Sequence, residues 1–309
     1  MCIQHRGIWT WGHVIYDYRA FFRNMEQLGL NRIVIWNDIL PRNAKDVLEE
    51  AHRRGIRLLW GFSWGWTDKC GENTKDIGAA RLHALRESIL AEFEQYKPLC
   101  SDGIYFQSFT ETDRTAVGGI RIAQAVTELV NAAADRIFAQ MPDLEIEFGL
   151  HATSVKNDLD CIAQTDPRIR IVWEDCGAFP FDYDPHNVDG FAQACTFTEK
   201  ILHLRGKGEK CGFVFKGMTK LDWSTFRYHT APYEIGTADA EFIRHRAEEK
   251  EPLWAYVTDG WQKNEAYVRE MLRLIAANPD VTVDVLLEDG MFEYSIRPPA
   301  KMYAQMLQS

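Results

Sequence analysis

Short apolar runs alternate with longer amphipathic stretches along almost the whole chain, and this rhythm constrains the fold more than any other feature of the sequence. The short runs have the length and the β-branched and aromatic content of buried strands. The longer stretches place apolar residues at a spacing near 3.6, as Leu82, Leu85 and Ile89 do, which predicts helices. Gly29 and Gly55 mark the ends of two of these helices.

Strands and helices can be assigned along this rhythm by residue range. The predicted strands are Ile3–Trp9, Arg32–Trp36, Ile56–Phe62, Gly103–Phe109, Glu145–Leu150, Ile169–Trp173, Gly212–Lys216 and Leu253–Thr258. The predicted helices are Tyr16–Leu28, Ala44–Arg54, Ala79–Tyr96, Gly119–Gln140, Ser154–Gln164, Val188–Leu204, Ala238–Glu249 and Asn264–Ala276.

Eight strand–helix units within about 280 residues are typical of the (β/α)8 or TIM barrel, whose usual size is roughly 250 residues. The alternative, a doubly wound sheet, normally has fewer strands and a glycine-rich first turn, whereas the first turn here is Trp9–Gly12. We therefore predict a single α/β domain, a TIM barrel over residues 1–309. Val281–Leu287 is a ninth strand-like run, followed by a helix-like tail at Ala300–Leu307. Either it is an extra C-terminal element or one earlier strand is misassigned.

Composition excludes several classes of partner. The net charge of −10 over 309 residues argues against non-specific nucleic-acid binding, because phosphate contacts need a basic surface. The N-terminus has no basic region followed by an apolar stretch, and no apolar run approaches the roughly 18 residues of a membrane span. The seven dispersed cysteines form no Cys-x-x-Cys pair, which favours reduced thiols. We expect a cytoplasmic protein, although a chain trimmed of its signal would look similar, and the oligomeric state stays open.

Glu111 is the first candidate for a catalytic residue. Catalytic groups of a TIM barrel lie at the C-terminal ends of strands and in the loops that follow, and Glu111 follows the strand predicted at Gly103–Phe109. Glycoside cleavage needs a carboxylic acid that protonates the leaving oxygen. The flanking Phe109 and threonines form an environment able to raise the pKa of Glu111. The alternative is a surface Glu that caps the next helix near Thr115, and Asp113 could orient Glu111 or begin that helix.

Glu174 and Asp175 follow the strand Ile169–Trp173 and supply the second carboxylate, a nucleophile or a base. Adjacent residues of an extended chain point to opposite sides, so only one of the two is expected to face the pocket. The alternative for either is a salt bridge with Arg170 or Lys216. The reserve carboxylates are Asp38 and Asp259.

The tryptophans are concentrated at strand ends and in loops, ten in the whole chain. Sugar rings pack on aromatic planes, so tryptophans in these positions favour a carbohydrate pocket, with core packing or a lid as the alternative. The residues concerned are Trp9, Trp11, Trp64, Trp66, Trp223 and Trp261.

Four basic residues could bind an anionic substituent such as a carboxylate, and each could equally be structural. They are His151, Lys216, Arg227 and His229. His151 could also be a general base or a metal ligand. Arg227 and His229 lie in the long segment Gly217–Gly236, and long loops at this face of a barrel tend to be lids or substrate clamps.

The segments His5–Trp11 and Asn31–Asp38 resemble the opening strands of β-hexosaminidases and α-glucuronidases. In those families a strand-one Arg-Gly leads the barrel and a strand-four Glu is the general acid, a role that the resemblance implies for Glu111. Thr110 stands where hexosaminidases carry the Asp of an Asp-Glu pair, and Lys216 is nearest the strand-seven Glu of the largest retaining clan. An acid at strand four with a carboxylate at strand six is closer to the α-glucuronidases, which invert.

The leading hypothesis is a glycoside hydrolase that acts on a small carbohydrate, with uronic-type acidic sugars as candidates, and that needs no cofactor or metal. The second hypothesis is a sugar isomerase or epimerase that uses a divalent metal, with Glu111, His151, Asp175 and Asp38 as ligands. The third is a carbohydrate-binding barrel without chemistry. Walker-type phosphate loops and His-Glu-x-x-His are absent from the sequence.

Overall fold

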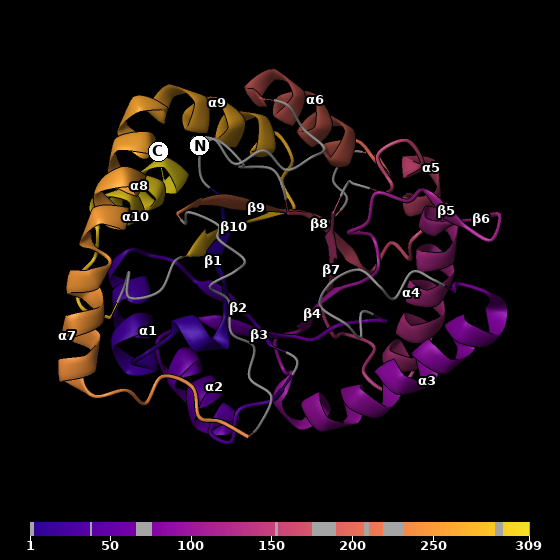
Figure 1. Cartoon of the computed structure of the whole chain (residues 1–309), viewed down its shortest axis with the longest axis horizontal. Helices are drawn as coiled ribbons and strands as arrows, with labels where there is room; N and C mark the ends of the chain where they lie inside the picture. The colour runs from indigo at the N-terminus through magenta and orange to yellow at the C-terminus, as the bar shows by residue number, and fades with distance from the viewer. Residues whose placement is uncertain are drawn as a thin grey trace.

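Eight parallel strands close into a barrel that helices surround, which confirms the predicted fold (Figure 1). The computed structural model describes residues 3–37, 39–65, 76–151, 154–174, 190–206, 210–218, 232–287 and 293–308. The barrel strands are β1 (His5–Trp11), β2 (Arg32–Trp36), β3 (Arg57–Gly61), β4 (Ile104–Gln107), β7 (Ile146–Leu150), β8 (Arg170–Trp173), β9 (Cys211–Met218) and β10 (Val281–Leu287). They neighbour one another in this order, and β10 pairs with β1 to close the ring.

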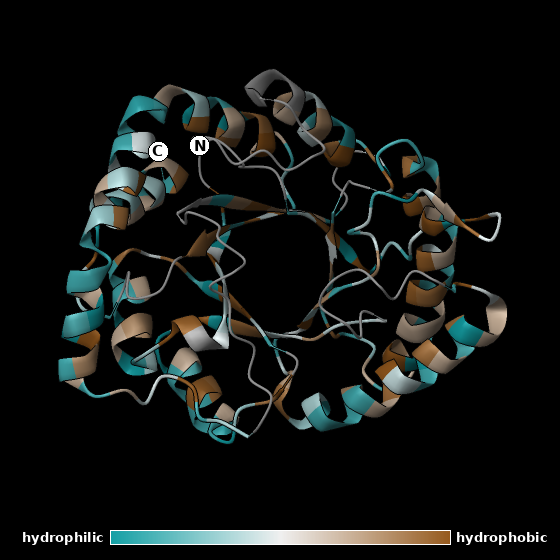
Figure 2. Ribbon diagram, viewed as in Figure 1, coloured by the Kyte–Doolittle hydropathy of each residue, from teal (hydrophilic) through white to brown (hydrophobic). Residues whose placement is uncertain are grey.

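Amphipathic helices cover the outside of the barrel, with their apolar sides toward the strands (Figure 2). They are α1 (Tyr18–Gln27), α2 (Ala44–Arg53), α3 (Ala79–Tyr96), α4 (Ile122–Phe138), α5 (Leu159–Ile162), α6 (Gly190–Leu202), α7 (Ala240–Glu249), α8 (Glu251–Lys263), α9 (Glu265–Ile275) and α10 (Pro298–Gln308). The short hairpin β5 (Ala116–Val117) and β6 (Ile120–Arg121) precedes α4, and 3-10 turns lie at Gly12–Val14 and Lys97–Leu99. Within the described residues, no helix is long and apolar enough to cross a membrane.

Local signals in the sequence set several helix boundaries. The Asp17 carboxylate accepts hydrogen bonds from the backbone N–H groups of Arg19 and Ala20, both at 3.0 Å, and so caps the first turn of α1. Gly29 and Gly55 follow α1 and α2 with φ of 67° and 68°, the left-handed conformation that commonly ends a helix. The two predicted helix ends at these glycines are therefore confirmed.

One predicted strand is wrong, and its correction explains the ninth run. Leu253–Thr258 lies inside helix α8, where Trp254, Val257 and Trp261 are buried at helical spacing while Tyr256 is exposed. Val281–Leu287 is the eighth barrel strand, paired with both β9 and β1. Between β9 and β10 the described residues include three helices, α7, α8 and α9, so the simple alternation of one strand with one helix fails there.

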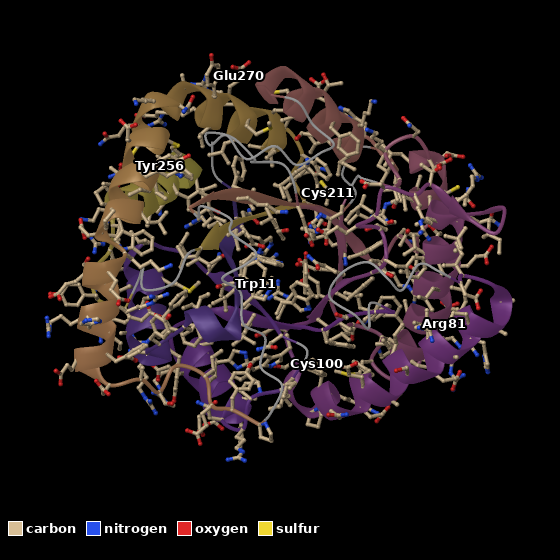
Figure 3. The ribbon with its side chains drawn as sticks, viewed as in Figure 1. Trp11, Arg81, Cys100, Cys211, Tyr256 and Glu270 are labelled. Carbon is tan, nitrogen blue, oxygen red and sulfur yellow. The ribbon has the colours of Figure 1, made fainter. Side chains whose placement is uncertain are left out.

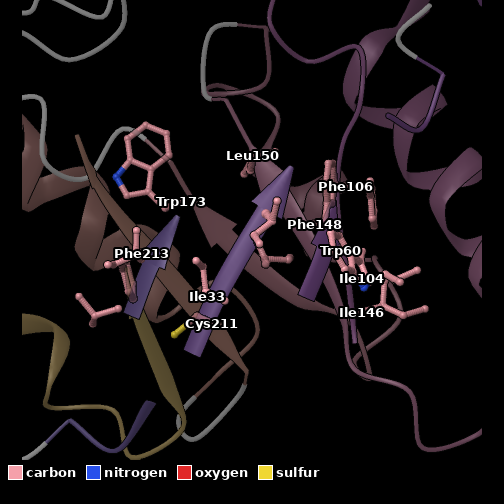
Figure 4. Packing of buried hydrophobic residues seen from close by; sticks show 14 of the residues in the cluster. Ile33, Trp60, Ile104, Phe106, Ile146, Phe148, Leu150, Trp173, Cys211 and Phe213 are labelled. Atoms are coloured by element: carbon pink, nitrogen blue, oxygen red, sulfur yellow. The ribbon is translucent and has the colours of Figure 1, made fainter. Parts of the chain in front are cut away.

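Alternate residues of each strand face two different layers. One layer lies between strands and helices, and Phe106 and Phe148 illustrate it with rings stacked 4.9 Å apart on the neighbouring strands β4 and β7 (Figure 4). The other layer fills the inside of the barrel, and we call it the lumen cluster. Its members are Trp9, Trp11, Val34, Trp36, Leu59, Tyr105, Val172, Val214 and Leu286. Because side chains alternate with a period of two, a residue two or four positions from a member of the lumen cluster on the same strand also points inward.

Charged residues close the lumen at the end where the strands begin. We call this group the ionic floor: Arg32, Arg57, Arg170, Glu145, Glu147, Asp280 and Asp284. Arg32 is fully buried, donates to both carboxylate oxygens of Glu147 at 3.0 and 2.7 Å, and lies 3.1 Å from Asp284. These pairs join β2, β7 and β10 across the inside of the barrel, so each buried charge is compensated by another strand.

Candidate active site

Glu174 is the centre of the polar cluster at the other end of the lumen, which we call the mouth, where the strands end. It directly follows β8, exposes 1% of its surface, and continues the inward face of that strand two residues after Val172. Gln107 Nε2 donates to both carboxylate oxygens, at 2.8 and 2.7 Å, and the Tyr105 hydroxyl also donates to Oε1. His151 Nε2 lies 2.6 Å from Oε2. One carboxylate therefore gathers side chains from β4 and from the end of β7.

The surroundings of Glu174 keep this carboxylate ionised. Burial alone would raise its pKa, but the charges of His151 and Lys216 and the hydrogen bonds from His151 and Tyr105 outweigh burial and lower the pKa to about 2. Burial and the adjacent charge of Glu174 raise the pKa of Tyr105 well above its ordinary value, which keeps its hydroxyl protonated as a donor. The mouth thus holds a fixed negative charge inside a shell of donors.

The predicted residues Glu174, His151 and Lys216 are brought together by the fold. His151 follows the last residue of β7 and Lys216 lies on β9, two positions after Val214 of the lumen cluster, and both are buried. The alternative in which Arg170 pairs with Glu174 is wrong, because Arg170 binds Glu145 and Asp280 in the ionic floor.

Tyr105 and Gln107 are site residues to which the sequence analysis assigns no role. Gln107 ends β4 and Tyr105 lies two positions before it, so alternation from a known strand end would have found both. Gly149 is equally informative, since a Cβ at this position would collide with the carboxylate of Glu174 and the hydroxyl of Tyr105. The contact between these two side chains therefore depends on a missing side chain on β7, between them.

Trp9 and Trp11 point into the barrel but are not open platforms. They expose 3% and 1% of their surfaces, and their rings meet edge to face at 4.7 Å, with Trp36 tilted against both. Figure 3 shows Trp11 near the centre of the barrel. With Tyr105, whose ring lies 5.8 Å from that of Trp9, these tryptophans fill the lumen between the ionic floor and the mouth. Because both side chains are buried, neither offers an exposed face on which a sugar could stack.

Three other predicted residues lie away from the mouth. Trp64 is fully buried and stacks on Phe106, in the layer between strands and helices. The prediction places Trp261 and Asp259 at the end of an eighth strand that is in fact helix α8. Trp261 is buried against Tyr303, and Asp259 is an exposed residue paired with Lys263 at 2.6 Å. Reading a helix as a strand is the reason for both errors.

Glu111 lies in the loop after β4, and its side chain is exposed to solvent. The buried environment predicted from Phe109 and Thr110 is wrong for Glu111, because those two side chains turn into the protein while Glu111 does not. The loop itself is tied to the segment after β7, since the Ser154 hydroxyl donates to the backbone carbonyl of Thr110 at 2.6 Å. Glu111 thus remains beside the mouth without being part of its buried cluster.

Several predicted residues fall outside the described part of the chain. They are Asp38, Trp66, Asp175, Trp223, Arg227 and His229. Of the adjacent pair of carboxylates, Glu174 faces the mouth, and Asp175 is one of these undescribed residues. Among the residues that the structure does describe, no group of three or more His, Cys, Asp or Glu side chains could hold a metal ion.

The segment around Tyr233 and Ile235, which precedes α7, borders the mouth on the side of β1 and β2. Tyr233 accepts a hydrogen bond from Asn37 Nδ2 at 3.2 Å, and Asn43 exchanges two hydrogen bonds with the backbone of Ile235, both at 2.9 Å. A Cβ at Gly12 would lie 2.8 Å from the Tyr233 hydroxyl, so Gly12 leaves room for this ring. The end of the β9–α7 connection is therefore fixed against the loops that follow β1 and β2.

The sequence matches no family model and no curated protein. Solved structures do match in fold, at low identity. A glycoside hydrolase family 5 enzyme from Prevotella bryantii B14, solved with a xyloglucan tetradecasaccharide, is 10% identical with a TM-score of 0.56, over 94% of this chain and 86% of that one. A family 18 chitinase from Pseudoalteromonas aurantia is 9% identical with a TM-score of 0.54, over 97% of this chain and 100% of that one.

A D-psicose 3-epimerase from Clostridium cellulolyticum H10, solved with D-tagatose, is 11% identical with a TM-score of 0.46, over 98% of this chain and 96% of that one, a score too low to carry weight. At these identities the matches show the fold alone: this chain has the TIM barrel found in glycoside hydrolases of families 5 and 18. The finer resemblance to α-glucuronidases and β-hexosaminidases stays a prediction.

Proposed function

We propose that the protein is a glycoside hydrolase whose active site is the mouth of the barrel, with Glu174 as its ionised carboxylate. The observation that carries this proposal is the environment of Glu174, a buried carboxylate that His151, Lys216, Gln107 and Tyr105 hold in its charged form. Glycoside cleavage passes through an oxocarbenium-like state, which a fixed negative charge stabilises. TIM barrels carry their chemistry at this end of the strands.

The low pKa of Glu174 suits a base, a nucleophile or a stabilising anion, and not the proton donor. Glu111 is the proposed donor. Its exposure leaves it accessible to a sugar bound at the mouth. Asp175 is the alternative to Glu174 as the carboxylate that partners Glu111.

The charge balance of the buried cluster supports an acidic sugar as substrate. Two basic side chains, His151 and Lys216, accompany the carboxylate of Glu174 in this cluster. A carboxylate on the substrate would complement this excess of basic groups. We therefore favour glycosides of uronic-type sugars over neutral ones.

A second candidate is a metal-dependent sugar isomerase or epimerase on the same barrel. The observation in its favour is the contact between His151 and Glu174, which brings one nitrogen and one oxygen donor together at the mouth. The other proposed ligands are the exposed Glu111 and the undescribed Asp38 and Asp175.

The test is hydrolysis of a panel of aryl glycosides and aryl glucuronides, with and without EDTA. We expect chelator-resistant turnover, greatest on glucuronides, that falls by about 10²- to 10⁴-fold in Glu174→Gln. Glu111→Gln should lose as much on poor leaving groups and far less on dinitrophenyl glycosides, whose departure needs no proton. The matched control is Glu128→Gln, an exposed residue of α4.

Wild-type turnover in Glu174→Gln would overturn the proposed site. Loss of activity with EDTA, together with isomerisation of free sugars when metal is restored, would favour the second candidate instead.

A further inference from the structure

Gln107 carries a buried polar atom that the described cluster does not use. The residue exposes 3% of its surface, and its side chain faces the lumen because Tyr105, two positions earlier on β4, belongs to the lumen cluster while Phe106 belongs to the outer layer. The amide oxygen Oε1 is fully buried and has no hydrogen-bond partner in the described structure. Buried polar atoms are nearly always paired in native proteins, so an unpaired one at a mouth of polar groups points to a ligand.

The orientation of this amide is fixed by its neighbour. Nε2 of Gln107 donates to both oxygens of Glu174, at 2.8 and 2.7 Å. Turning the amide over would set its oxygen against an ionised carboxylate, where two acceptors would repel each other. Oε1 is therefore an obligate acceptor that points away from Glu174, and only a donor such as a hydroxyl group can satisfy it.

We propose that Gln107 is a specificity-determining residue, whose Oε1 accepts a hydrogen bond from one hydroxyl of the sugar that lies against Glu174. This inference rests on the proposed function for the identity of the ligand as a sugar. The same amide binds the carboxylate through Nε2 and the sugar through Oε1, so it links recognition of one hydroxyl to the position of Glu174. A sugar that lacks this hydroxyl leaves Oε1 buried and unpaired, which is how a polar site rejects an analogue.

The test compares monodeoxy and deoxyfluoro analogues of the preferred substrate with the parent, in the wild type and in Gln107→Met. Fluorine accepts but does not donate a hydrogen bond, so loss of the donor alone should suffice. We expect the wild type to disfavour one deoxy position and its fluoro analogue by about 10²-fold in kcat/KM. In Gln107→Met that preference should fall to within about threefold, even though activity on every substrate drops because Glu174 also loses a donor.

The preference for the parent substrate over its deoxy analogue, compared between the wild type and Gln107→Met, separates recognition from general damage to the site. A residue that only positions Glu174 would lower all rates together and leave the preference intact, and that result would overturn the inference. The matched control is Gln124→Met, an exposed glutamine of α4, which should keep both rate and preference. Gln107→Asn is the second variant if Gln107→Met does not fold, and uniform binding of all analogues by the wild type would by itself refute the proposal.

Calorimetric binding of the same free sugars keeps this inference distinct from the proposed function. If no glycoside is hydrolysed but the wild type binds the parent sugar with the Gln107-dependent preference, the recognition role stands and hydrolysis falls. If neither turnover nor binding depends on a hydroxyl, the recognition role is refuted whatever the reaction proves to be.

Discussion

The two ends of the lumen use buried charge in opposite ways. At the ionic floor, three arginines meet four carboxylates, and Arg32 alone contacts Glu147 on β7 and Asp284 on β10. At the mouth, the carboxylate of Glu174 is surrounded by neutral donors and basic groups, and the amide oxygen of Gln107 is left without a partner among the described residues.

This difference separates stability from function. At the floor, opposite charges pair across strands, fix the register of the barrel and balance one another. Donors that converge on one anion, with an unused acceptor beside it, form an incomplete arrangement that a substrate can complete. The tryptophans Trp9, Trp11 and Trp36 lie between the two ends, so the floor and the mouth are separated by apolar rings.

The largest expected effect comes from removing the central cation of the floor. Arg32→Met should cost about 3–5 kcal/mol of folding free energy, because Glu147 and Asp284 would remain buried without their cation. Urea denaturation followed by circular dichroism measures this loss. Arg269→Met, which removes an exposed pair with Glu265, should cost less than about 1 kcal/mol. Equal losses in the two variants would show that the floor does not stabilise the barrel.

The second effect is a dependence of stability on pH. Burial, opposed by Arg32, raises the pKa of Asp284 to about 7, so the folded protein holds a proton that the unfolded chain releases near pH 4. Stability from this group is therefore complete below about pH 4 and lost as pH rises toward 7, by up to about 4 kcal/mol.

Glu174 and Glu145 behave in the opposite sense. The pKa of each is lowered to about 2 despite burial, by His151 at the mouth and by Arg170 at the floor, so their stabilisation is lost as pH falls from about 4.5 toward 2. Thermal unfolding from pH 2 to 8 should show greatest stability near pH 4–5. In Asp284→Asn the decline from pH 4 to 7 should be much shallower, and a decline as steep as that of the wild type would refute the assignment to Asp284.

The third effect concerns the mouth. Gly149→Ala should lower activity by about 10- to 100-fold, because the added methyl group pushes Tyr105 away from Glu174. The stability loss should be modest, about 1–3 kcal/mol. Gly55→Ala adds a methyl group in open space at a left-handed φ, so it should cost about 1–2 kcal/mol without any loss of activity. Full activity in Gly149→Ala would show that the contact between Tyr105 and Glu174 is dispensable.

The smallest effect is expected from Asp259→Asn. This carboxylate belongs to neither end of the lumen, since it lies on α8 with 58% of its side chain exposed and pairs with Lys263. Stability should change by no more than about 0.5 kcal/mol and activity should be unchanged. A large loss of activity would restore Asp259 to the site and contradict its position in the fold.

Local patterns in the sequence are enough to predict the barrel and part of its site. Hydrophobic periodicity is a local property, so it marks all eight barrel strands, Val281–Leu287 among them. The strand-end rule then selects Glu174, His151 and Lys216. The same pattern also marks Leu253–Thr258 as a strand, because this run is apolar enough to resemble one. Only its packing in α8 shows that it is the misassigned run.

Which strand-end residues meet one another is a property of the tertiary structure. Whether Trp64 reaches the mouth or the outer layer, and whether Glu111 is buried or exposed, depends on how each loop turns after its strand, which no local pattern encodes. The hydrogen bonds of Tyr105 and Gln107 to Glu174 join residues 69 and 67 positions apart in the chain. Such contacts exist only once the barrel has closed. The absence of a side chain at Gly149 matters for the same reason, because Gly149 lies between Tyr105 and Glu174 only in the closed barrel.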